Sequence, residues 1–393
     1  MRIVLPFCLG TPPRGFYHEF MAAIAEALLE LGHTPLPFAF ARMLEARPEE
    51  AQALGRMLDS ERPDAAIDVA GWGCALTQVL AKHPHLGSMA YVALLLDQPH
   101  NQPLNGISSP RLYGAYPDLD HPAQVRLLFP GIRLAGEMLA PPAIRRSRDY
   151  FATATERDID VLYVGNLSPR CLARFWSDPT HPVREGDYDV PFCDALFEAV
   201  LAEPKRSFHL AVKAALLQSP KVRPGRHLQI QLRAVEMCLR QCFRRDAVLA
   251  VARSGVNLLV VGRGWESLRL PGNVKIIAQT DYEGLFRLAA RAKVSLDAST
   301  YIDGVNDRVF SYALNHSVCF TNATGLLRTL IGEERGIFFY SIRDLEALAE
   351  SIKGLLGSPE RLREAGERAH ETVLGAHTWR HRVSNLLSQI TAS

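Results

Sequence analysis

The stretch VNLLVVGRGWE at residues 256–266 opens the segment that decides the fold, and VKIIAQ at residues 274–279 and AKVSLDAS at residues 292–299 continue it. Four short runs of β-branched and aliphatic residues are expected to form strands: Val256–Val261, Val274–Ala278, Lys293–Ala298 and Val318–Thr321. Between the second and third runs, the apolar residues of Tyr282–Arg291 recur at helical spacing. Strands that alternate with helices of this length predict a parallel sheet with helices on both faces.

Polar loops follow three of these strands. In doubly wound parallel sheets, ligands bind at the carboxyl ends of the strands. The loops are Gly262-Arg263-Gly264-Trp265, Gln279-Thr280-Asp281 and Ser299 through Arg308. The first loop has two glycines that would allow a close backbone approach to a ligand, although a lone G-x-G is a weak signal.

The third loop carries the strongest ligand signal. Its segment Asp303-Gly304-Val305-Asn306-Asp307-Arg308 combines a glycine for a tight turn with Asn and Asp residues suited to a helix N-cap. A helix is predicted over Arg308–Asn315, and its free N–H groups and dipole would favour an anion beside the fixed charge of Arg308. This combination suits a diphosphate, and it also fits an ordinary capped loop with a surface arginine.

Residues 256–388 resemble the C-terminal domain of a GT-B glycosyltransferase of the group-1-like family that includes the spore maturation protein CgeB. The residues that carry the resemblance are the glycine turn before Trp265, the PGNV segment at 271–274, the helix start at Asp281-Tyr282, Gly304, Asn306 through Phe310, and the tail His377-Thr378-Trp379 with Arg382. Members usually show a stretch similar to R-x-F-E-A, in which the glutamate grips the donor ribose. Here Ser311 stands at the position of that glutamate.

The resemblance implies a GT-B architecture, an α/β fold in which two Rossmann-like domains face a cleft. It also implies that the second domain binds a nucleotide-diphosphate sugar as the donor, without a metal or a further cofactor. Arg308 and the N–H groups after Asn306 would hold the diphosphate, and Arg263 would be a second cation. The full set of expected donor-binding residues is Gly262, Arg263, Gly264, Trp265, Asp281, Tyr282, Asn306, Asp307, Arg308 and Ser311.

Length and composition predict a globular chain with two domains. The chain has 393 residues, of which 48% are hydrophobic and 22% charged. The formal net charge of +2 gives no global case for a nucleic-acid partner. Seven cysteines without a C-x-x-C pair favour a reduced cytoplasmic protein over a disulfide or zinc framework. The apolar run at the N-terminus is too short for a signal peptide, and no run reaches transmembrane length.

The N-terminal part has a β-α-β rhythm that predicts a Rossmann-like domain over residues 1–140. Its expected strands are Arg2–Phe7, Thr34–Ala41 (an edge strand, because it contains prolines), Pro63–Val69 and Met89–Leu96. Its expected helices are Phe16–Leu31, Glu49–Asp59 and Ala75–Lys82. A further strand pair is expected within Arg126–Leu134. The resemblance implies that the last helix, in residues 378–393, packs back on this domain.

Residues 141–157 are Pro-rich and basic and are expected to link the two domains, the second of which would span residues 158–377. The run Arg145-Arg146-Ser147-Arg148 could touch an acidic partner or lipid headgroups in a peripheral membrane contact, but a solvated linker is the commoner use of such a run. Residues 171–226 break the α/β rhythm and predict a helical insertion. The helix expected at Leu228–Arg253 carries five arginines, which could bind a nucleic acid or a membrane but more often form a solvated face.

Asp97 and His100 follow the fourth strand and are candidates for acid–base work, because a carboxylate and an imidazole lie three residues apart at a strand end. If the reaction inverts the anomeric centre, one of them would be the base. Otherwise they would position the acceptor, or Asp97 would only cap its loop. Arg14, Gly15 and Asn166 lie in other β-α turns that would face the same cleft and contact the acceptor.

The function predicted from these observations is a glycosyltransferase that moves a sugar from a nucleotide-diphosphate sugar to an acceptor glycan, lipid-linked glycan or protein. Two alternatives are left open. A sugar-nucleotide epimerase shares the GT-B architecture but needs several converging carboxylates. A non-catalytic binding or assembly subunit would explain Ser311, whereas the intact Asn306-Asp307-Arg308 segment speaks against it.

Overall fold

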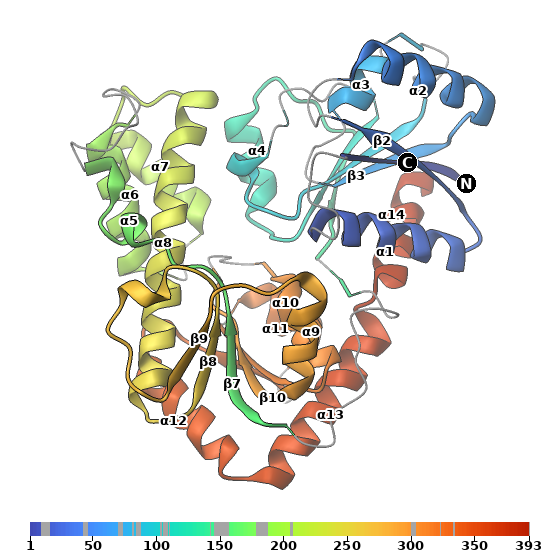
Figure 1. The fold of residues 1–393 in the computed structure, drawn as a ribbon. Coiled ribbons are helices and arrows are strands. Elements are labelled where there is room, and N and C mark those ends of the chain that lie inside the picture. Colours follow the sequence, from blue (N-terminus) through green and yellow to red (C-terminus); the bar gives the residue numbers. More distant parts are fainter. Residues whose placement is uncertain are drawn as a thin grey trace. The chain divides into compact units, whose positions relative to one another are not determined.

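The computed structural model describes most of the chain as two compact units. The described residues are 1–8, 16–41, 46–69, 74–80, 82–83, 88–102, 104, 109, 111–141, 143–144, 157–177, 188–204, 207–299, 304–322, 324–332 and 335–392. Unit 1 comprises Met1–Ala143 with Thr378–Ser393, and unit 2 comprises Ile144–His377 (Figure 1). Each unit contains one six-stranded sheet in which every strand pairing is parallel.

The unit 1 sheet has the strand order β2-β1-β3-β4-β5-β6. Its strands are β1 (Arg2–Cys8), β2 (Thr34–Phe40), β3 (Ala65–Val69), β4 (Ala90–Leu94), β5 (Leu112–Tyr116) and β6 (Gly136–Leu139). Its helices are α1 (Phe16–Glu30), α2 (Pro48–Glu61), α3 (Cys74–Leu80), the 3-10 turn η2 (Pro99–Asn101), α4 (His121–Leu128) and α14 (Trp379–Ala392). The proline-containing strand β2 is at the sheet edge, as predicted, since proline cannot donate to a ladder.

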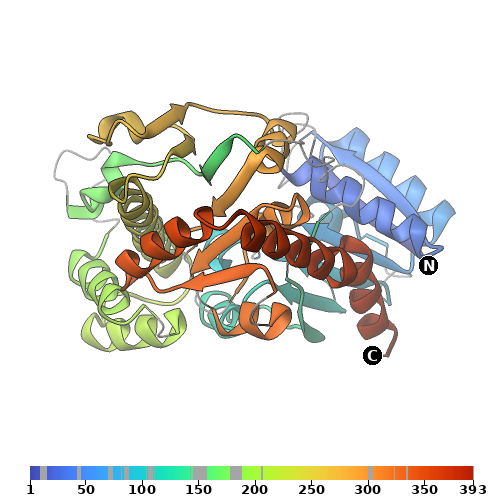
Figure 2. The ribbon, with the colours of Figure 1, turned by 90° about the horizontal axis from the view of Figure 1, so that it is seen from below.

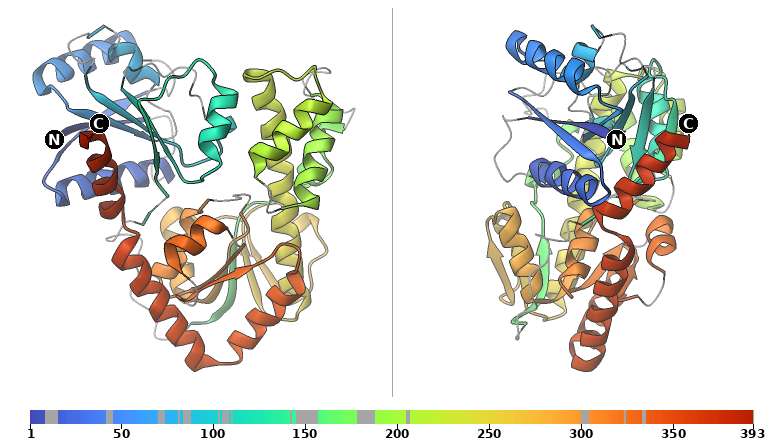
Figure 3. Two further views of the ribbon diagram at one scale, coloured as in Figure 1. Left: turned by 180° about the vertical axis from the view of Figure 1, so that it is seen from behind. Right: turned by 90° about the vertical axis from the view of Figure 1, so that its right-hand side faces the viewer.

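The last helix of the chain completes the core of unit 1. Helices α1 and α14 lie side by side (Figures 1 and 3), and Phe20 meets Trp379 edge-to-face at 5.2 Å between ring centroids. Both aromatic rings belong to one apolar cluster with the inner faces of β1, β3, β4 and β5. The C-terminal segment therefore supplies part of the core on which the first strands of the chain rest.

The predicted strand pair within Arg126–Leu134 is wrong. The segment His121–Leu128 is helix α4, with Pro122 in its first turn, and the neighbouring strands are β5 and β6. The apolar run at Val125–Phe129 is too short to show a clear period, so it fits a buried helix as well as a strand. Proline at the first helical positions, which costs no hydrogen bond there, is the local signal that favours the helix.

The unit 2 sheet has the strand order β12-β11-β10-β7-β8-β9. Its strands are β7 (Ile159–Val164), β8 (Leu258–Val261), β9 (Val274–Ile277), β10 (Ala292–Leu296), β11 (Val318–Asn322) and β12 (Ile337–Tyr340). Its helices are α5 (Pro169–Leu172), the 3-10 turns η4 (Phe175–Ser177) and η5 (Trp265–Ser267), α6 (Val190–Ala202), α7 (Phe208–Gln218), α8 (Arg226–Arg253), α9 (Tyr282–Arg291), α10 (Asp307–Leu314), α11 (Gly325–Ile331), α12 (Leu345–Leu356) and α13 (Pro359–Ala376). The four predicted strands and the helix at Tyr282–Arg291 are confirmed.

Two apolar layers sandwich this sheet. One contains the inner faces of α9, α10, α11 and α13, and the other contains those of α8 and α12. Figure 2 views the chain from the side of α12 and α13. Because helices cover both faces, the middle strands are mostly buried, as expected of a parallel sheet. The described polar loops of unit 2 therefore gather at the strand ends.

Helices α6 and α7 lie within the segment 171–226 that was predicted as a helical insertion, and α8 corresponds to the long helix predicted at Leu228–Arg253. Helices α6 and α7 pack on each other, and α6 also packs on the outer part of α8 (Figure 1). Among the described residues, no helix combines the length and the hydrophobicity needed to span a membrane.

Candidate functional site

The loops after β7 and β8 are joined by hydrogen bonds at the carboxyl edge of the unit 2 sheet. The N–H of Arg263 donates to Asn166 Oδ1 at 2.9 Å, and the N–H of Leu167 donates to the Arg263 carbonyl at 2.9 Å. Asn166 and Arg263, both named from the sequence, thus lie together, and both are exposed. The Arg263 side chain is accessible to a ligand at this edge.

Gly262 and Gly264 serve the packing of these two loops. Their φ angles are +152° and +90°. A Cβ at Gly262 would lie 2.2 Å from the Gly165 carbonyl oxygen, and one at Gly264 would lie 1.9 Å from that of Leu167. The sequence suggested that the two glycines let a ligand approach the backbone. The structure shows instead that they let the backbone of the β7 loop approach.

We expect Gly264→Ala to lower the free energy of unfolding by at least about 2 kcal/mol, because the new methyl group would clash with backbone and the φ angle disfavours any other residue. Urea unfolding of the purified variant measures this loss. Gly272→Ala is the matched control, since no atom lies within 4 Å of its Cβ position. Equal unfolding midpoints for the two variants would contradict the packing role of Gly264.

Trp265 is a core residue. Its side chain is 0% exposed, its Nε1–H donates to the Gly165 carbonyl at 2.6 Å, and its ring meets Tyr163 edge-to-face at 5.4 Å. The assignment of Trp265 to the donor site is therefore corrected: its indole holds the β7 loop in place and has no exposed face for a nucleotide.

Helix α10 begins as the sequence predicted, with Asn306 as its N-cap. Asn306 Oδ1 accepts from the N–H of Arg308 at 3.2 Å. The Arg308 guanidinium turns inward, where one terminal nitrogen donates to the Val164 carbonyl and the other lies 3.7 Å from Asp297 Oδ1. The Arg308 side chain is 20% exposed and that of Asp297 1% exposed. Arg308 thus links the carboxyl ends of β7 and β10 while keeping part of its surface open.

Burial shifts the pKa values of Asp297, Arg308 and Asp307. Burial raises the pKa of Asp297, and Arg308 acts against that rise. Burial alone would lower the pKa of Arg308, but Asp297 together with the nearby Tyr312, Tyr163 and Asp307 raises this pKa above its usual value. Burial also raises the pKa of Asp307 to about 6, although Arg308 opposes it. Arg308 stays charged throughout the physiological range and is the fixed cation of the site.

Sequence reasoning missed Arg244 as a site residue; it brings a second, partly buried cation to the same place from helix α8. Its Nη1 donates to the Asn166 carbonyl at 3.1 Å, whereas its Nε is buried and has no hydrogen-bond partner within the described residues. Burial lowers the pKa of Arg244, and the positive charge of Arg308 lowers it further. The neighbouring cation Arg240 pairs with Glu236 at 2.7 Å, but no described carboxylate pairs with Arg244. Leaving a partly buried cation without a carboxylate partner costs free energy.

Two buried tyrosine hydroxyls lie close enough to Arg308 and Asp297 for these charges to affect their pKa values. Tyr163 is at the end of β7 and Tyr312 is on α10. Neither Oη atom has a hydrogen-bond partner within the described residues. Burial raises the pKa of both phenols, so both are neutral and can donate a hydrogen bond.

The other predicted donor residues are spread along the same edge. Asp281 is exposed and caps α9, because its Oδ1 accepts from the N–H of Gly284 at 2.7 Å. Tyr282 begins α9. Ser311 lies on α10 with only 3% of its surface exposed, so its hydroxyl is part of the packed helix face. Asp281 and Asn306 thus have confirmed capping roles, whatever else they bind.

The unit 1 candidates form a polar group of their own at the ends of β4 and β5. Asp97 is half-buried and organises its own loop, since it accepts from the N–H of Gln98 at 2.8 Å and from Asn101 Nδ2 at 3.3 Å. His100 is 5% exposed and lies near His121, whose pKa burial lowers to about 3. Of the two candidates, Asp97 is thus the more exposed and His100 is buried. Arg14 and Gly15 lie outside the described residues.

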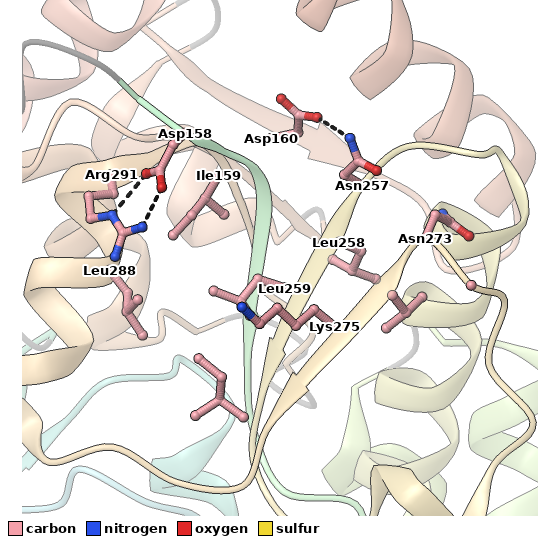
Figure 4. Close-up of a pocket in the computed structure, with 13 residues that line it drawn as sticks. Asp158, Ile159, Asp160, Asn257, Leu258, Leu259, Asn273, Lys275, Leu288 and Arg291 are labelled. Carbon is pink, nitrogen blue, oxygen red and sulfur yellow. Dashed lines mark hydrogen bonds and ion pairs between the residues drawn. The ribbon is translucent and has the colours of Figure 1, made fainter.

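A cavity of about 400 Å³ lies at the opposite, amino-terminal edge of the unit 2 sheet (Figure 4). Three of its charged residues are engaged within the chain: Arg291 Nε lies 2.8 Å from Asp158 Oδ1, and Asp160 accepts from Asn257 at 2.9 Å and from Lys293 at 2.6 Å. Lys275 also lines the cavity. None of the predicted site residues lines this cavity. The candidate site is therefore the carboxyl edge, which carries Asn166, Arg263 and Arg308.

Comparison with known proteins gives a family match for part of unit 2 and a fold match for the whole chain. Residues 240–388 match the family model described as glycosyl transferase-like. This range includes Arg244, Arg263 and Arg308. No curated protein sequence matches the chain.

Solved structures similar to the chain come from several glycosyltransferases. One is a sucrose-phosphate synthase from Thermosynechococcus elongatus, with 13% identity and a TM-score of 0.53 over 100% of this chain and 99% of that chain. Another is an alpha-glucosyltransferase in complex with UDP and DNA, with 12% identity and a TM-score of 0.55 over 100% and 99%. A third is Anabaena HepE in complex with UDP and glucose, with 11% identity and a TM-score of 0.54 over 100% of both chains. The chain therefore has the GT-B fold, with two Rossmann-like units, and carries a glycosyl transferase-like segment in unit 2.

Proposed function

We propose that the chain is a glycosyltransferase that takes its sugar from a nucleoside-diphosphate sugar bound to unit 2. The observation that supports this proposal best is the pair of partly buried cations, Arg244 and Arg308, at the carboxyl ends of β7 and β10. Both lie in the segment that matches the glycosyl transferase-like family. UDP is the first donor nucleotide to test, because two of the similar structures described above are complexes with UDP. The resemblance to the CgeB-containing group is part of this proposal.

The chemistry proposed for the site is stabilisation of a leaving diphosphate. Negative charge grows on the diphosphate as the glycosidic bond breaks, and fixed cations in a poorly solvated site stabilise it without rearranging. Arg308 is held in place by Val164 and Asp297, so it is preorganised. Arg244, the exposed Arg263 and the N-terminal N–H groups of α10 would complete the contacts. These protein groups can neutralise the charge of the leaving diphosphate as a metal ion would, so we propose that the transfer is metal-independent.

The acceptor side is assigned to unit 1. Asp97 would accept the acceptor's proton if the reaction inverts the anomeric centre, and it would orient the acceptor hydroxyl if it does not. Acceptors in keeping with the proposal are a glycan, a lipid-linked glycan or a protein.

Thermal unfolding in the presence of nucleotides tests the donor proposal. A ligand that binds only the native state stabilises it by about 2.7 kcal/mol at a hundredfold excess over its Kd. We expect UDP and UDP-sugars to raise the midpoint, UMP to raise it less and uridine hardly at all. The same shift is expected with EDTA as with Mg²⁺. If no nucleoside diphosphate changes the midpoint, the donor site as described is wrong.

One observation favours the alternative of a non-catalytic GT-B-like subunit. Ser311 replaces the glutamate expected from the resemblance, and its side chain is packed away. Turnover separates the two functions: a catalyst slowly hydrolyses or transfers the sugar of its cognate UDP-sugar, whereas a binding subunit shows the thermal shift and leaves the UDP-sugar intact.

A further inference from the structure

Helix α7 carries the most exposed leucine among the large hydrophobic residues that the structure describes. Leu217 is 87% exposed and Leu210 is 51% exposed. The two residues are seven positions apart and therefore lie on one face of the helix. The opposite face is buried through Phe208, Ala211, Val212 and Ala215. The leucines thus occupy the centre of the outward face, where a solvated helix normally has polar residues.

Basic residues surround these leucines, and acidic residues are absent from the segment. Residues 204–235 contain seven Lys and Arg and no Asp or Glu, in a chain with 44 basic and 42 acidic residues. Lys213 lies between the leucines, and Lys221, Arg223 and Arg226 follow in the turn to α8; all four are exposed. On the adjacent α6, Asp194 and Glu198 contact Arg174 at 3.7 and 2.5 Å, so these two carboxylates are balanced locally.

We propose that the α7 face and the following basic turn form a docking surface for an anionic lipid bilayer. Such surfaces combine apolar side chains that enter the headgroup region with Lys and Arg that meet the negative lipids. A nucleic acid would match the cations but leave the leucines exposed to water, and an apolar protein partner would match the leucines but not the cations. The lipid surface satisfies both features. This surface is separate from the nucleotide site and can be tested without a donor.

Flotation with lipid vesicles tests the surface directly. The full-length protein is expected to float with vesicles that contain phosphatidylglycerol and to stay behind with pure phosphatidylcholine. Leu210→Ser together with Leu217→Ser should weaken this binding about tenfold or more, because two leucines lose their apolar contact. Lys221→Gln together with Arg223→Gln should weaken it by about fivefold for each cation removed.

The matched control is Leu29→Ser on α1, since Leu29 is 63% exposed but lies next to Glu30. It should float like the wild type, and all variants should keep the wild-type unfolding midpoint because the changed side chains are exposed. The proposal is overturned if the leucine variant floats as well as the wild type. It is also overturned if the protein binds DNA in a leucine-independent way and ignores anionic vesicles, or if the leucine changes only dissociate an oligomer.

Discussion

Replacing Arg308 with Ala is expected to abolish measurable UDP binding and to destabilise the protein by about 3 kcal/mol at neutral pH. The stability loss arises because Asp297, at 1% exposure, then keeps only the Thr321 hydroxyl as a side-chain hydrogen-bond partner among the described residues. Removing one member of a buried ion pair typically costs about 3–5 kcal/mol, since the remaining charge has neither water nor a partner. The binding loss arises because the fixed cation of the proposed diphosphate site is removed.

The same variant should show a pH-dependent stability defect. Burial already raises the pKa of Asp297 above its unfolded value, and without Arg308 the pKa rises further. A carboxyl group whose pKa is raised by folding binds more protons in the native state than in the unfolded state, so stability falls as pH increases through the native pKa. The difference between Arg308→Ala and wild type should therefore be small near pH 4 and grow up to pH 8.

Urea unfolding at several pH values, with UDP titration of the native protein, separates the two roles of Arg308. Adding Asp297→Asn to Arg308→Ala should recover part of the stability, because a neutral amide replaces the unpaired carboxylate, but should not recover UDP binding. A variant that is destabilised but still binds UDP normally would mean that Arg308 is only a structural link. A variant that is as stable as wild type at pH 8 would show that the pair with Asp297 contributes little.

The strand and helix pattern of unit 2 could be predicted because each element carries its own local signal. The β-branched runs gave β8, β9, β10 and β11, and the capping residues Asp281 and Asn306 gave the starts of α9 and α10. These signals depend on residues near in sequence. The segment around Val125 lacked a clear period, and its helix was missed for that reason.

The site was only partly predictable because its geometry depends on residues far apart in sequence. Asn166 and Arg244 are 78 positions apart, and nothing local in the arginine-rich helix α8 distinguishes Arg244 from its neighbours. Conversely, Trp265 was placed in the donor site because of its loop position, whereas its ring packs inward against Tyr163. Tertiary packing decides whether a single side chain is buried, and the pattern of one sequence carries no information about that packing.

The contrast between neighbouring arginines on α8 allows a sharp test of the anion site. Arg245 is bound to Asp246 at 2.7 Å, whereas Arg244 faces the β7 loop and has no described carboxylate partner. Both residues have the same helix propensity and charge. Any difference between Arg244→Ala and Arg245→Ala therefore reports on what the Arg244 guanidinium contacts.

We expect Arg244→Ala to weaken UDP binding by about tenfold or more, since a hydrogen bond to a charged group contributes about 1.5–3 kcal/mol. Uridine binding should change little, because the loss concerns the diphosphate. Without nucleotide, the variant should be as stable as wild type or slightly more stable, because burial and the charge of Arg308 both disfavour the Arg244 cation. If Arg244 lowers the stability of the nucleotide-free protein, its role is in the complex with the nucleotide.

Calorimetric titration with UDP, UMP and uridine, together with thermal unfolding of the free protein, measures both effects. Arg245→Ala should match wild type in every titration. If Arg244→Ala weakens uridine and UDP equally, the residue shapes the β7 loop and does not contact the diphosphate. If wild type binds UDP and Arg244→Ala binds it equally well, the donor site stands without Arg244, and Arg308 and Arg263 alone would have to neutralise the diphosphate.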